Sequence, residues 1–327
     1  MVGSSWVAAP GQSVTSNQVE RPIVSVVIPM FQSEAWIGAT LATVEAQTYS
    51  LVETIVVDDG STDQGPAVVA EFASSCERPV RLIRTTNRGV AAARNTGITE
   101  SDGDFVALLD ADDLWGPRKL ELQVAKLGDS GAPMCTCGYE FFDDRTGRRT
   151  GVVRVEDGSS ALRGWLSLEG NGLALASAAL ISRPVLDELK LFDPEFSVSA
   201  DLEFALRIAE LGHLDSIPET LVRYRLHPRQ MHRQVSGLAG DVDLLYDRVF
   251  AKKQDPSFER RCRANLAAHL GFSHLLRGRV DMALPYLWQS LCRDPRRIFT
   301  LPIRAIVRRL DRRLQLCASG RSTRRTP

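Results

Sequence analysis

The residues best suited to chemistry are three carboxylates that fall within four positions: Asp110, Asp112 and Asp113. They lie in the segment DFVALLDADDLW, whose apolar run at residues 105–109 is typical of a central strand buried on both faces. Crowded carboxylates repel one another unless a cation or hydrogen-bond donors lie between them. Their hard oxygens suit Mg²⁺ or Mn²⁺, ions that also bind phosphate. A solvated acidic turn ahead of a helix is the other interpretation, and this stretch alone favours neither.

A second acidic pair, Asp58 and Asp59, follows an earlier predicted strand at residues 54–57. Strands and helices alternate with short turns through this half of the chain, which indicates a mostly parallel sheet covered by helices on both faces. Ligands bind beyond the carboxyl ends of the strands in such sheets. We therefore expect both acidic groups to line a single crevice.

The elements that must position these residues follow from the hydrophobic pattern. Predicted strands lie at residues 23–28, 54–57, 80–83, 105–109, 134–142, 173–181 and 221–226. From about residue 237 the pattern changes to helices alone. Residues 266–276 and 280–292 resemble one tetratricopeptide-type hairpin, a unit that needs further copies to bury a core. Residues 298–316 read as a basic amphipathic helix.

Composition excludes several classes of function. Over 327 residues the chain is 44% hydrophobic and 24% charged with a net charge of zero, so nothing indicates a nucleic-acid partner. Six scattered cysteines include no second pair that would complete a zinc site. No segment approaches the roughly 18 apolar residues of a membrane span, and the N-terminus lacks the features of a secretion signal. We predict a cytoplasmic protein.

Four segments, taken in order, carry a resemblance to a known family: VSVVIPMFQSE, QTYSLVETIVVDDGSTD, NRGVAAARNTG and DFVALLDADDLW. They resemble the family 2 glycosyltransferases, over about residues 23–230. The resemblance implies the GT-A fold, an α/β, Rossmann-like fold of nucleotide-diphospho-sugar transferases with a mainly parallel central sheet. The predicted division is a disordered N-terminal segment, a GT-A catalytic domain, a helical region with one tetratricopeptide-like hairpin and a basic amphipathic tail, at residues 1–21, 22–235, 236–293 and 294–327.

The resemblance also implies which residues bind the donor nucleotide. Pro29, Phe31 and Glu34 follow the first strand, where the family holds the base and ribose. Asp59 matches the acid that hydrogen-bonds the base, with Asp58 beside it. The turns after the first two strands therefore form the nucleotide site in this interpretation.

The implied metal site is built on the family's Asp-x-Asp pair, with Asp110 toward the ribose and Asp112 on the ion. Arg94 matches the basic residue of the nucleotide site, and Asp113 is a further ligand or a support. The segment LVRYRLH resembles the closing Tyr-Arg-x-His segment, so His227 joins Asp110 and Asp112 as a metal ligand or is a polar residue at a strand end. The implied cofactor is Mn²⁺ or Mg²⁺.

The catalytic base is assigned through the segment LFDPEFSVSADLEFALRIAELG. It resembles the family's Phe-Asp turn followed by a Glu-Asp pair that opens a helix, so Asp201 is the candidate base. Ala200 stands where the family often has Glu, so a second, supporting carboxylate is missing there. The alternative for Asp201 is a helix N-cap, which is favourable by about 1 kcal/mol.

The predicted function is an inverting glycosyltransferase that moves a sugar from a nucleotide donor, of the UDP-sugar class, to a hydroxyl of a glycan or lipid-linked glycan. Surface polysaccharide or glycoconjugate synthesis is the implied setting. The first alternative is a catalytically inactive GT-A-like scaffold with a helical interaction module, which Ala200 favours. The second, a sugar-1-phosphate nucleotidyltransferase, needs a Gly-rich basic loop after the first strand, and residues 30–33 do not supply one.

The C-terminal segment is rich in arginine, with only Asp294 and Asp311 as acidic residues from position 293 onward. A basic amphipathic helix can bind anionic lipid, here at the inner face of the membrane. It can also pack on the catalytic domain as a solvated helix. The sequence leaves both interpretations open.

Overall fold

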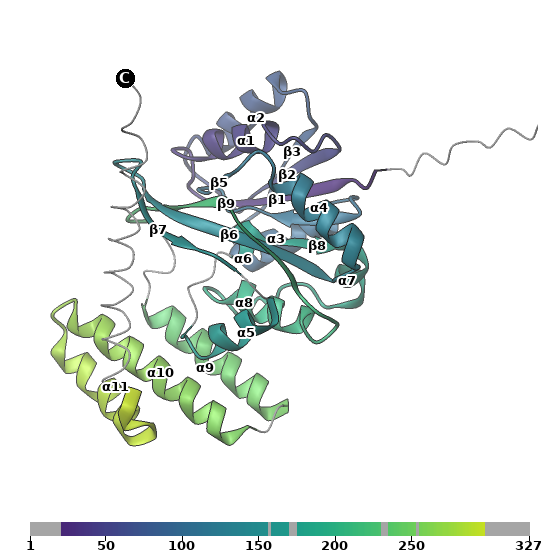
Figure 1. Cartoon of the computed structure of the whole chain (residues 1–327). Helices are drawn as coiled ribbons and strands as arrows, with labels where there is room; N and C mark the ends of the chain where they lie inside the picture. Colours follow the sequence, from purple (N-terminus) through teal and green to yellow (C-terminus); the bar gives the residue numbers. More distant parts are fainter. Residues whose placement is uncertain (1–20, 156–157, 170–174, 230–234, 253–254, 298–327) are drawn as a thin grey trace, which may run out of the picture.

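The computed structural model describes residues 21–155, 158–169, 175–229, 235–252 and 255–297 (Figure 1). At residues 158–161, 175 and 235–238 it describes the backbone alone. The segment predicted to be disordered (except Arg21) and the part of the predicted basic tail beyond Arg297 lie outside these ranges.

One nine-stranded sheet organises the chain, in the order β3-β2-β1-β4-β8-β6-β9-β5, with β7 beside β6. The first four strands pair in parallel. They are β1 (Val24–Met30), β2 (Val52–Asp58), β3 (Val80–Arg84) and β4 (Phe105–Leu108). This half matches the predicted strand–helix alternation, because parallel neighbours need a crossover connection between them.

The second half of the sheet is mixed, which corrects the expectation of a mainly parallel sheet. Its strands are β5 (Leu114–Trp115), β6 (Met134–Asp143), β7 (Arg149–Val153), β8 (Leu180–Ser182) and β9 (Asp215–Leu226). β8 pairs antiparallel with both β4 and β6, β7 with β6 and β5 with β9, while β6 and β9 are parallel. The short turn between β6 and β7 allows only an antiparallel pair, and Gly147 takes a φ of 63° in it.

The predicted strand at residues 173–181 is wrong for most of its described part. The structure has a short helix, α6 (Leu175–Ala178), followed by the three-residue β8. Residues 173–174 lie outside the described ranges. The run is rich in alanine, the strongest helix former, so its apolar character alone does not specify a strand.

Helices cover both faces of the sheet, as the alternating pattern predicts. One face carries α1 (Ile37–Glu45), α2 (Gly65–Ser75) and α4 (Lys119–Ser130). The other carries α3 (Val90–Thr99), α5 (Gly158–Leu166), α7 (Arg183–Glu188) and α8 (Ala200–Ile208). Side chains alternate along β1, so Val26 and Ile28 pack in the apolar cluster under α1, α2 and α4, and Val27 packs in the cluster on the opposite face of the sheet.

Three C-terminal helices gather on the α3–α8 side of the sheet, opposite α1 and α2 (Figure 1). They are α9 (Val235–Lys252), α10 (Pro256–Leu275) and α11 (Val280–Arg293). Side chains of α9 and α10 lie in the same apolar cluster as α8, and the Tyr246 hydroxyl of α9 donates to the Leu166 carbonyl at 2.6 Å. The helical region therefore shares a core with the sheet half of the chain. None of the described helices combines the length and apolar character of a membrane span.

The buried Lys119 at the start of α4 predicts a pH-dependent stability. Its Nζ donates to Gln123 Oε1 at 2.8 Å and lies 4.0 Å from the centroid of the Trp115 ring. Burial lowers the pKa of Lys119 from 10.5 to about 8. Between these values the unfolded state holds the proton and the folded state does not, so stability rises with pH.

We expect the free energy of unfolding of the parent to rise by about 3 kcal/mol relative to that of Lys119→Met between pH 8 and pH 10.5, at about 1.4 kcal/mol per pKa unit. Urea denaturation of both proteins across this range measures the difference. Lys126→Met, on an exposed side of the same helix, is the control and should follow the parent. Parallel curves for Lys119→Met and the parent would contradict the prediction.

Candidate active site

The acidic turn after β4 is fastened to the first helix. The Thr40 hydroxyl on α1 donates to the carbonyls of Ala111 and Asp113, each at 2.9 Å. Within the turn, the Asp113 amide donates to the Asp110 carbonyl at 3.1 Å. The three carboxylates thus leave a single rigid turn, each in a different direction.

Asp113 points into the protein and is fully buried. Its Oδ2 accepts the Ser177 hydroxyl at 2.6 Å, and its Oδ1 accepts the Arg225 amide at 3.0 Å. Burial raises the pKa of Asp113 well above its usual range, and the charges of Asp112 and Asp110 raise it further. Of the two roles expected for Asp113, this geometry is that of a support that joins the turn to α6 and β9.

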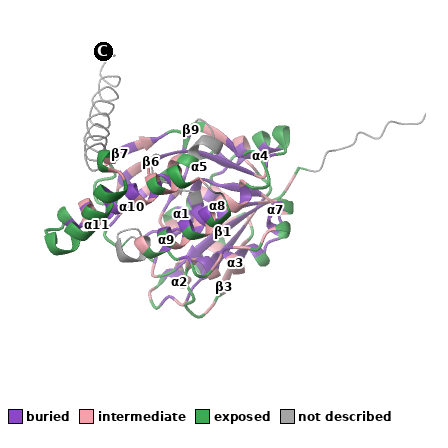
Figure 2. Cartoon of the chain, turned by 90° about the horizontal axis from the view of Figure 1, so that it is seen from below, coloured by how far each residue is buried: buried purple, intermediate pink, exposed green. Residues whose placement is uncertain are grey.

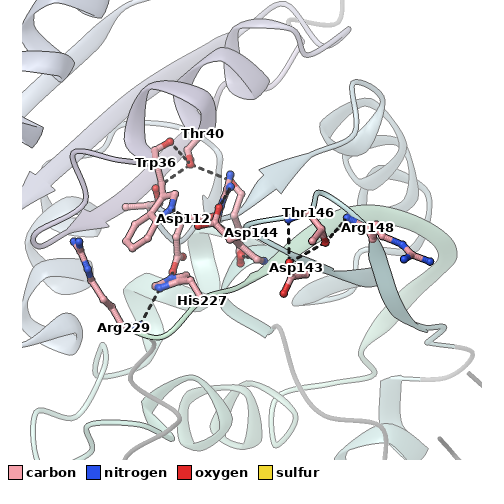
Figure 3. Close-up of polar contacts among 12 residues, drawn as sticks. Trp36, Thr40, Asp112, Asp143, Asp144, Thr146, Arg148, His227 and Arg229 are labelled. Atoms are coloured by element: carbon pink, nitrogen blue, oxygen red, sulfur yellow. Dashed lines mark hydrogen bonds and ion pairs between the residues drawn. The ribbon is translucent and has the colours of Figure 1, made fainter.

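Asp112 faces the end of β9, where its Oδ2 lies 2.7 Å from His227 Nε2 (Figure 3). The Arg229 amide donates to His227 Nδ1 at 3.2 Å, on the side of the ring away from Asp112. The Trp36 ring packs against the imidazole with centroids 3.9 Å apart. Arg225 Nε donates to the Asp112 carbonyl at 2.6 Å, which fixes the main chain beneath the pair.

The Asp112–His227 pair fits a divalent cation whose other ligands come from elsewhere. A carboxylate oxygen and an imidazole nitrogen suit Mn²⁺ and Mg²⁺, which usually complete their coordination with substrate phosphates and water. Within the described ranges no group of three or more His, Cys, Asp and Glu side chains converges to hold an ion. Asp110, the third predicted ligand, does not join the pair in a ready-made cluster.

Asp110 instead pairs with Arg94 on α3, whose Nη2 lies 2.7 Å from Asp110 Oδ1. The Arg94 side chain is buried, and its Nε makes no hydrogen bond within the described part of the chain. A guanidinium with a spare buried donor suits an anionic ligand, because an unpaired N–H in such a place is unfavourable.

Asp201 lies in the first turn of α8, but the helix N-cap is Ser199. The structure therefore excludes the N-cap interpretation of Asp201. Burial raises the pKa of the Asp201 carboxyl, the Arg94 charge lowers it and the Asp110 charge raises it. Asp201 therefore lies within electrostatic range of the Arg94–Asp110 pair, which joins α3 to the turn after β4.

The two carboxylates at the end of β2 hold loops in the structure. Asp59 accepts the amides of Arg88 at 2.9 Å and Gly89 at 2.7 Å, which orients the loop that leads into α3. Asp58 accepts the Ser61 amide at 2.9 Å and Arg84 Nε at 3.0 Å. Both carboxylates are buried, and their predicted contacts with a nucleotide stay predictions.

The turn after β1 interlocks with the turn after β2. Gln32, at a φ of 50°, accepts the amides of Thr62 at 3.2 Å and Asp63 at 3.1 Å through its Oε1. Glu34 accepts the Gln64 amide at 2.9 Å. Pro29 lies in register with Val57 inside the sheet, and Phe31 projects outward with 48% of its surface exposed. Apart from Pro29, which lies in β1, the predicted base and ribose residues therefore lie on two adjoining turns.

The family of the chain follows from a comparison with known proteins. Residues 25–189 match the model of glycosyl transferase family 2. The chain belongs to this family. Residues 25–189 include all the predicted nucleotide-site residues and both acids of the Asp-x-Asp pair, while Asp201 and His227 lie beyond the match.

Relatives of this glycosyltransferase cover different shares of its length. An uncharacterised glycosyltransferase of Nostoc is 28% identical over 230 residues, 67% of this chain and 70% of the relative. The UDP-Glc:α-D-GlcNAc-diphosphoundecaprenol β-1,3-glucosyltransferase WfgD of Escherichia coli is 34% identical over 124 residues. That match spans 38% of this chain and about half (48%) of the relative.

Solved structures share the fold of this glycosyltransferase at low sequence identity. Staphylococcus aureus TarS 1–349 in complex with UDP has a TM-score of 0.60 and 18% identity, with 93% of each chain covered. The mannosyltransferase PcManGT of Pyrobaculum calidifontis, in complex with GDP-Man and Mn²⁺, has a TM-score of 0.59 and 22% identity over 84% of this chain and 76% of that one. These likenesses confirm the predicted GT-A fold.

Several residues around the site escaped the sequence analysis of this glycosyltransferase. Asp144 accepts hydrogen bonds from Arg225 Nη1 at 2.7 Å and from Trp36 Nε1 at 3.4 Å. It thereby joins the residue that bonds Asp112 to the ring that packs on His227. The hydrogen bond from Arg225, ahead of other causes, lowers the pKa of Asp144. Tyr224 lies near the acidic turn, since the carboxylates there raise its pKa after burial does. Tyr224 and Arg225 had a usable signal, because they are the Tyr-Arg of the Tyr-Arg-x-His segment that ends at His227.

Ser177 predicts a measurable stability change, because its hydroxyl is buried and donates to the Asp113 carboxylate. We expect Ser177→Ala to lower the free energy of unfolding by about 2 kcal/mol, because it leaves a buried hydrogen-bond acceptor of Asp113 without its partner. Urea denaturation measures it. The control is Ser74→Ala, an exposed serine bonded only within its helix, which should stay within about 0.5 kcal/mol of the parent. Equal midpoints for Ser177→Ala and the parent would contradict the prediction.

Proposed function

We propose that this glycosyltransferase moves a sugar, with inversion, from a UDP-sugar donor to a hydroxyl of a glycan or lipid-linked glycan. The observation that carries the proposal is the pairing of Asp110 with Arg94 and of Asp112 with His227 at one acidic turn, with Asp201 within electrostatic range of Asp110 and Arg94. The E. coli relative is named for a UDP-glucose donor and a diphosphoundecaprenol-linked acceptor, and TarS was solved with UDP. These names support the UDP class and a lipid-linked acceptor.

In this proposal the donor nucleotide lies along the turns that follow β1 and β2, with Phe31, Glu34 and Asp59 toward its base. Arg94 directs its spare Nε toward the donor while its Nη2 holds Asp110 in place. Asp112 and His227 hold Mn²⁺ or Mg²⁺. When bound, the ion supplies positive charge that stabilises the leaving diphosphate.

Asp201 is the proposed base. The acceptor hydroxyl attacks the anomeric carbon as its proton passes to the Asp201 carboxylate, and the bond from that carbon to the diphosphate breaks. One displacement on the face opposite the leaving group inverts the configuration. The raised pKa of Asp201 suits this role, because a stronger base accepts the proton more readily at neutral pH.

A thermal-shift screen with UDP, GDP and CDP, each with and without Mn²⁺, tests the donor class, because a ligand that binds the native state raises the unfolding midpoint. We expect a shift with UDP that grows with Mn²⁺ and release of UDP from UDP-glucose or UDP-N-acetylglucosamine. A shift with GDP alone would change the donor class. No shift and no UDP release would favour the inactive scaffold.

We also propose that the C-terminal region makes peripheral contact with anionic membrane at the inner face, beside the helical region predicted at 236–293. Support comes from an exposed apolar stripe on α11 at Val280, Leu284, Trp288 and Leu291, in the green exposed part of that helix (Figure 2). Trp288 exposes 66% of its surface. Arginines dominate the sequence from position 293 onward, so basic residues follow the apolar stripe along the chain, and interfacial helices combine the same two features.

Sedimentation with vesicles tests the contact. We expect the full chain to pellet with vesicles that contain a third phosphatidylglycerol and to stay in solution with pure phosphatidylcholine. Both Trp288→Ser and deletion of residues 294–327 should weaken the pelleting. Equal pelleting of the deletion variant and the parent would refute a role for the tail.

A further inference from the structure

The segment at residues 192–199 leads into α8, the helix that carries Asp201, and it is held from two sides. On the side of the nucleotide site, Asn95 of α3 accepts the Phe192 amide and donates to the Phe192 carbonyl, each at 2.8 Å. Asn95 directly follows Arg94, and the Arg94 guanidinium lies 5.4 Å from the centroid of the Phe192 ring. The start of the segment, Phe192, is therefore held by Asn95 and Arg94, and Arg94 is the residue that pairs with Asp110.

The other side of the segment is held by one carboxylate of α9. Asp241 Oδ2 accepts three successive backbone amides, those of Ser197 at 2.8 Å, Val198 at 2.6 Å and Ser199 at 3.0 Å. The hydroxyls of both serines lie 3.3 Å from the same oxygen. Asp241 is buried. Consecutive amides that surround one oxygen form an anion-binding nest, and here the chain supplies its own anion.

Arg248, two turns further along α9, forms ion pairs with the same segment. Its Nη1 lies 2.6 Å from Asp193 Oδ2, and it also pairs with Glu195. Its guanidinium lies 4.9 Å from the centroid of the Phe196 ring. α9 thus contacts the segment through two residues, and Asp241 is the one bonded to Ser197, Val198 and Ser199, directly before α8.

We propose that Asp241 is a positioning residue for catalysis, which sets the place of α8 and so of Asp201. The N-cap Ser199 is bonded directly to Asp241, and Asp201 follows it by two residues. This inference rests on the proposed function, because it takes Asp201 as the base. It makes the C-terminal helical region a part of the catalytic apparatus. Small displacements matter here, since a shift of about 1 Å in a reacting group lowers rates by about 10²-fold.

The experiment compares Asp241→Ala and Asp241→Asn with the matched control Asp243→Ala in the full chain. Asp243 lies on the same helix with 61% of its side chain exposed and pairs only at 3.6 Å with Arg263 among the contacts described. We measure UDP release from UDP-glucose and UDP-N-acetylglucosamine, the dissociation constant of UDP with Mn²⁺, and amide exchange over residues 197–208.

We expect Asp241→Ala to lower kcat by about 10²-fold with the dissociation constant of UDP within about twofold of the parent. Amide exchange over 197–208 should rise. Asp241→Asn keeps one acceptor oxygen, so it should recover part of the loss, and Asp243→Ala should match the parent. Parent-like kcat and amide exchange in Asp241→Ala would overturn the proposal. So would a parallel loss of UDP affinity, or loss of the folded state in Asp241→Asn as well, because either marks a general scaffold role.

The two proposals fail differently. If Asp201 is not the base, Asp201→Asn keeps its activity whatever Asp241 does. If Asp201→Asn is inactive and Asp241→Ala has the turnover of the parent, only the positioning role fails. Amide exchange over residues 197–208 needs no sugar donor, so unchanged exchange in Asp241→Ala overturns the positioning role even if neither donor releases UDP.

Discussion

Replacing Asp201 with asparagine is expected to lower turnover by about 10³-fold, within the range that general bases contribute. The amide has nearly the size of the carboxylate but cannot accept the proton of the acceptor hydroxyl. UDP affinity should change little, because in the proposed function Asp201 acts on the acceptor hydroxyl. Release of UDP from a UDP-sugar, followed at saturating donor, gives the turnover, and thermal shift gives the UDP affinity.

The matched control is Asp129→Asn, which makes the same exchange on an exposed residue of α4 and should leave turnover unchanged. The pH dependence adds a second readout. Burial raises the pKa of Asp201, and the base must be ionised, so the parent's kcat should rise with pH through a midpoint above the usual aspartate value. Parent-like turnover in Asp201→Asn would show that another group takes the proton.

The parallel half of the fold could be predicted from the sequence because its signals are local. Each strand from β1 to β4 is a short β-branched or apolar run, and β1, β2 and β3 are each followed by a turn and a helix. The second half of the sheet could not be predicted in the same way. Apart from the β6–β7 hairpin, its antiparallel pairs join strands that are far apart in the chain, such as β4 with β8, and period alone does not specify partners.

The candidate site divides along the same line. Asp58, Asp59, Asp110 and Asp112 are visible in the sequence because they end strands. The role of each carboxylate depends on partners far away in the sequence. The Asp113 carboxylate, for example, is buried where the Ser177 hydroxyl and the Arg225 amide donate hydrogen bonds to it. No local pattern announces such partners.

Asp241 is the clearest case of a contact that the sequence conceals. It lies in a helical region that the residue pattern separated from the catalytic domain, yet it bonds the segment before α8. An aspartate in an amphipathic helix is ordinarily a solvated residue, so its type carries no signal. Only the packing of α9 on α8 reveals its part.

Asp112→Asn is expected to remove the response to metal. An amide is a weaker ligand than a carboxylate, so the Mn²⁺-dependent part of the UDP thermal shift should vanish and turnover should fall by about 10²–10³-fold, as when one stabilising group for transition-state charge is lost. His227→Ala should do the same, because Asp112 Oδ2 and His227 Nε2 lie 2.7 Å apart and are proposed to hold one ion.

A double-mutant cycle decides whether the two residues act through that ion. If they do, Asp112→Asn combined with His227→Ala should be about as inactive as either single variant, because the ion is already lost. Additive losses would mean that the residues act separately, with His227 held by the Trp36 ring as a structural residue. Asp144→Asn tests the second case, because it weakens the wall around His227 without removing either proposed ligand.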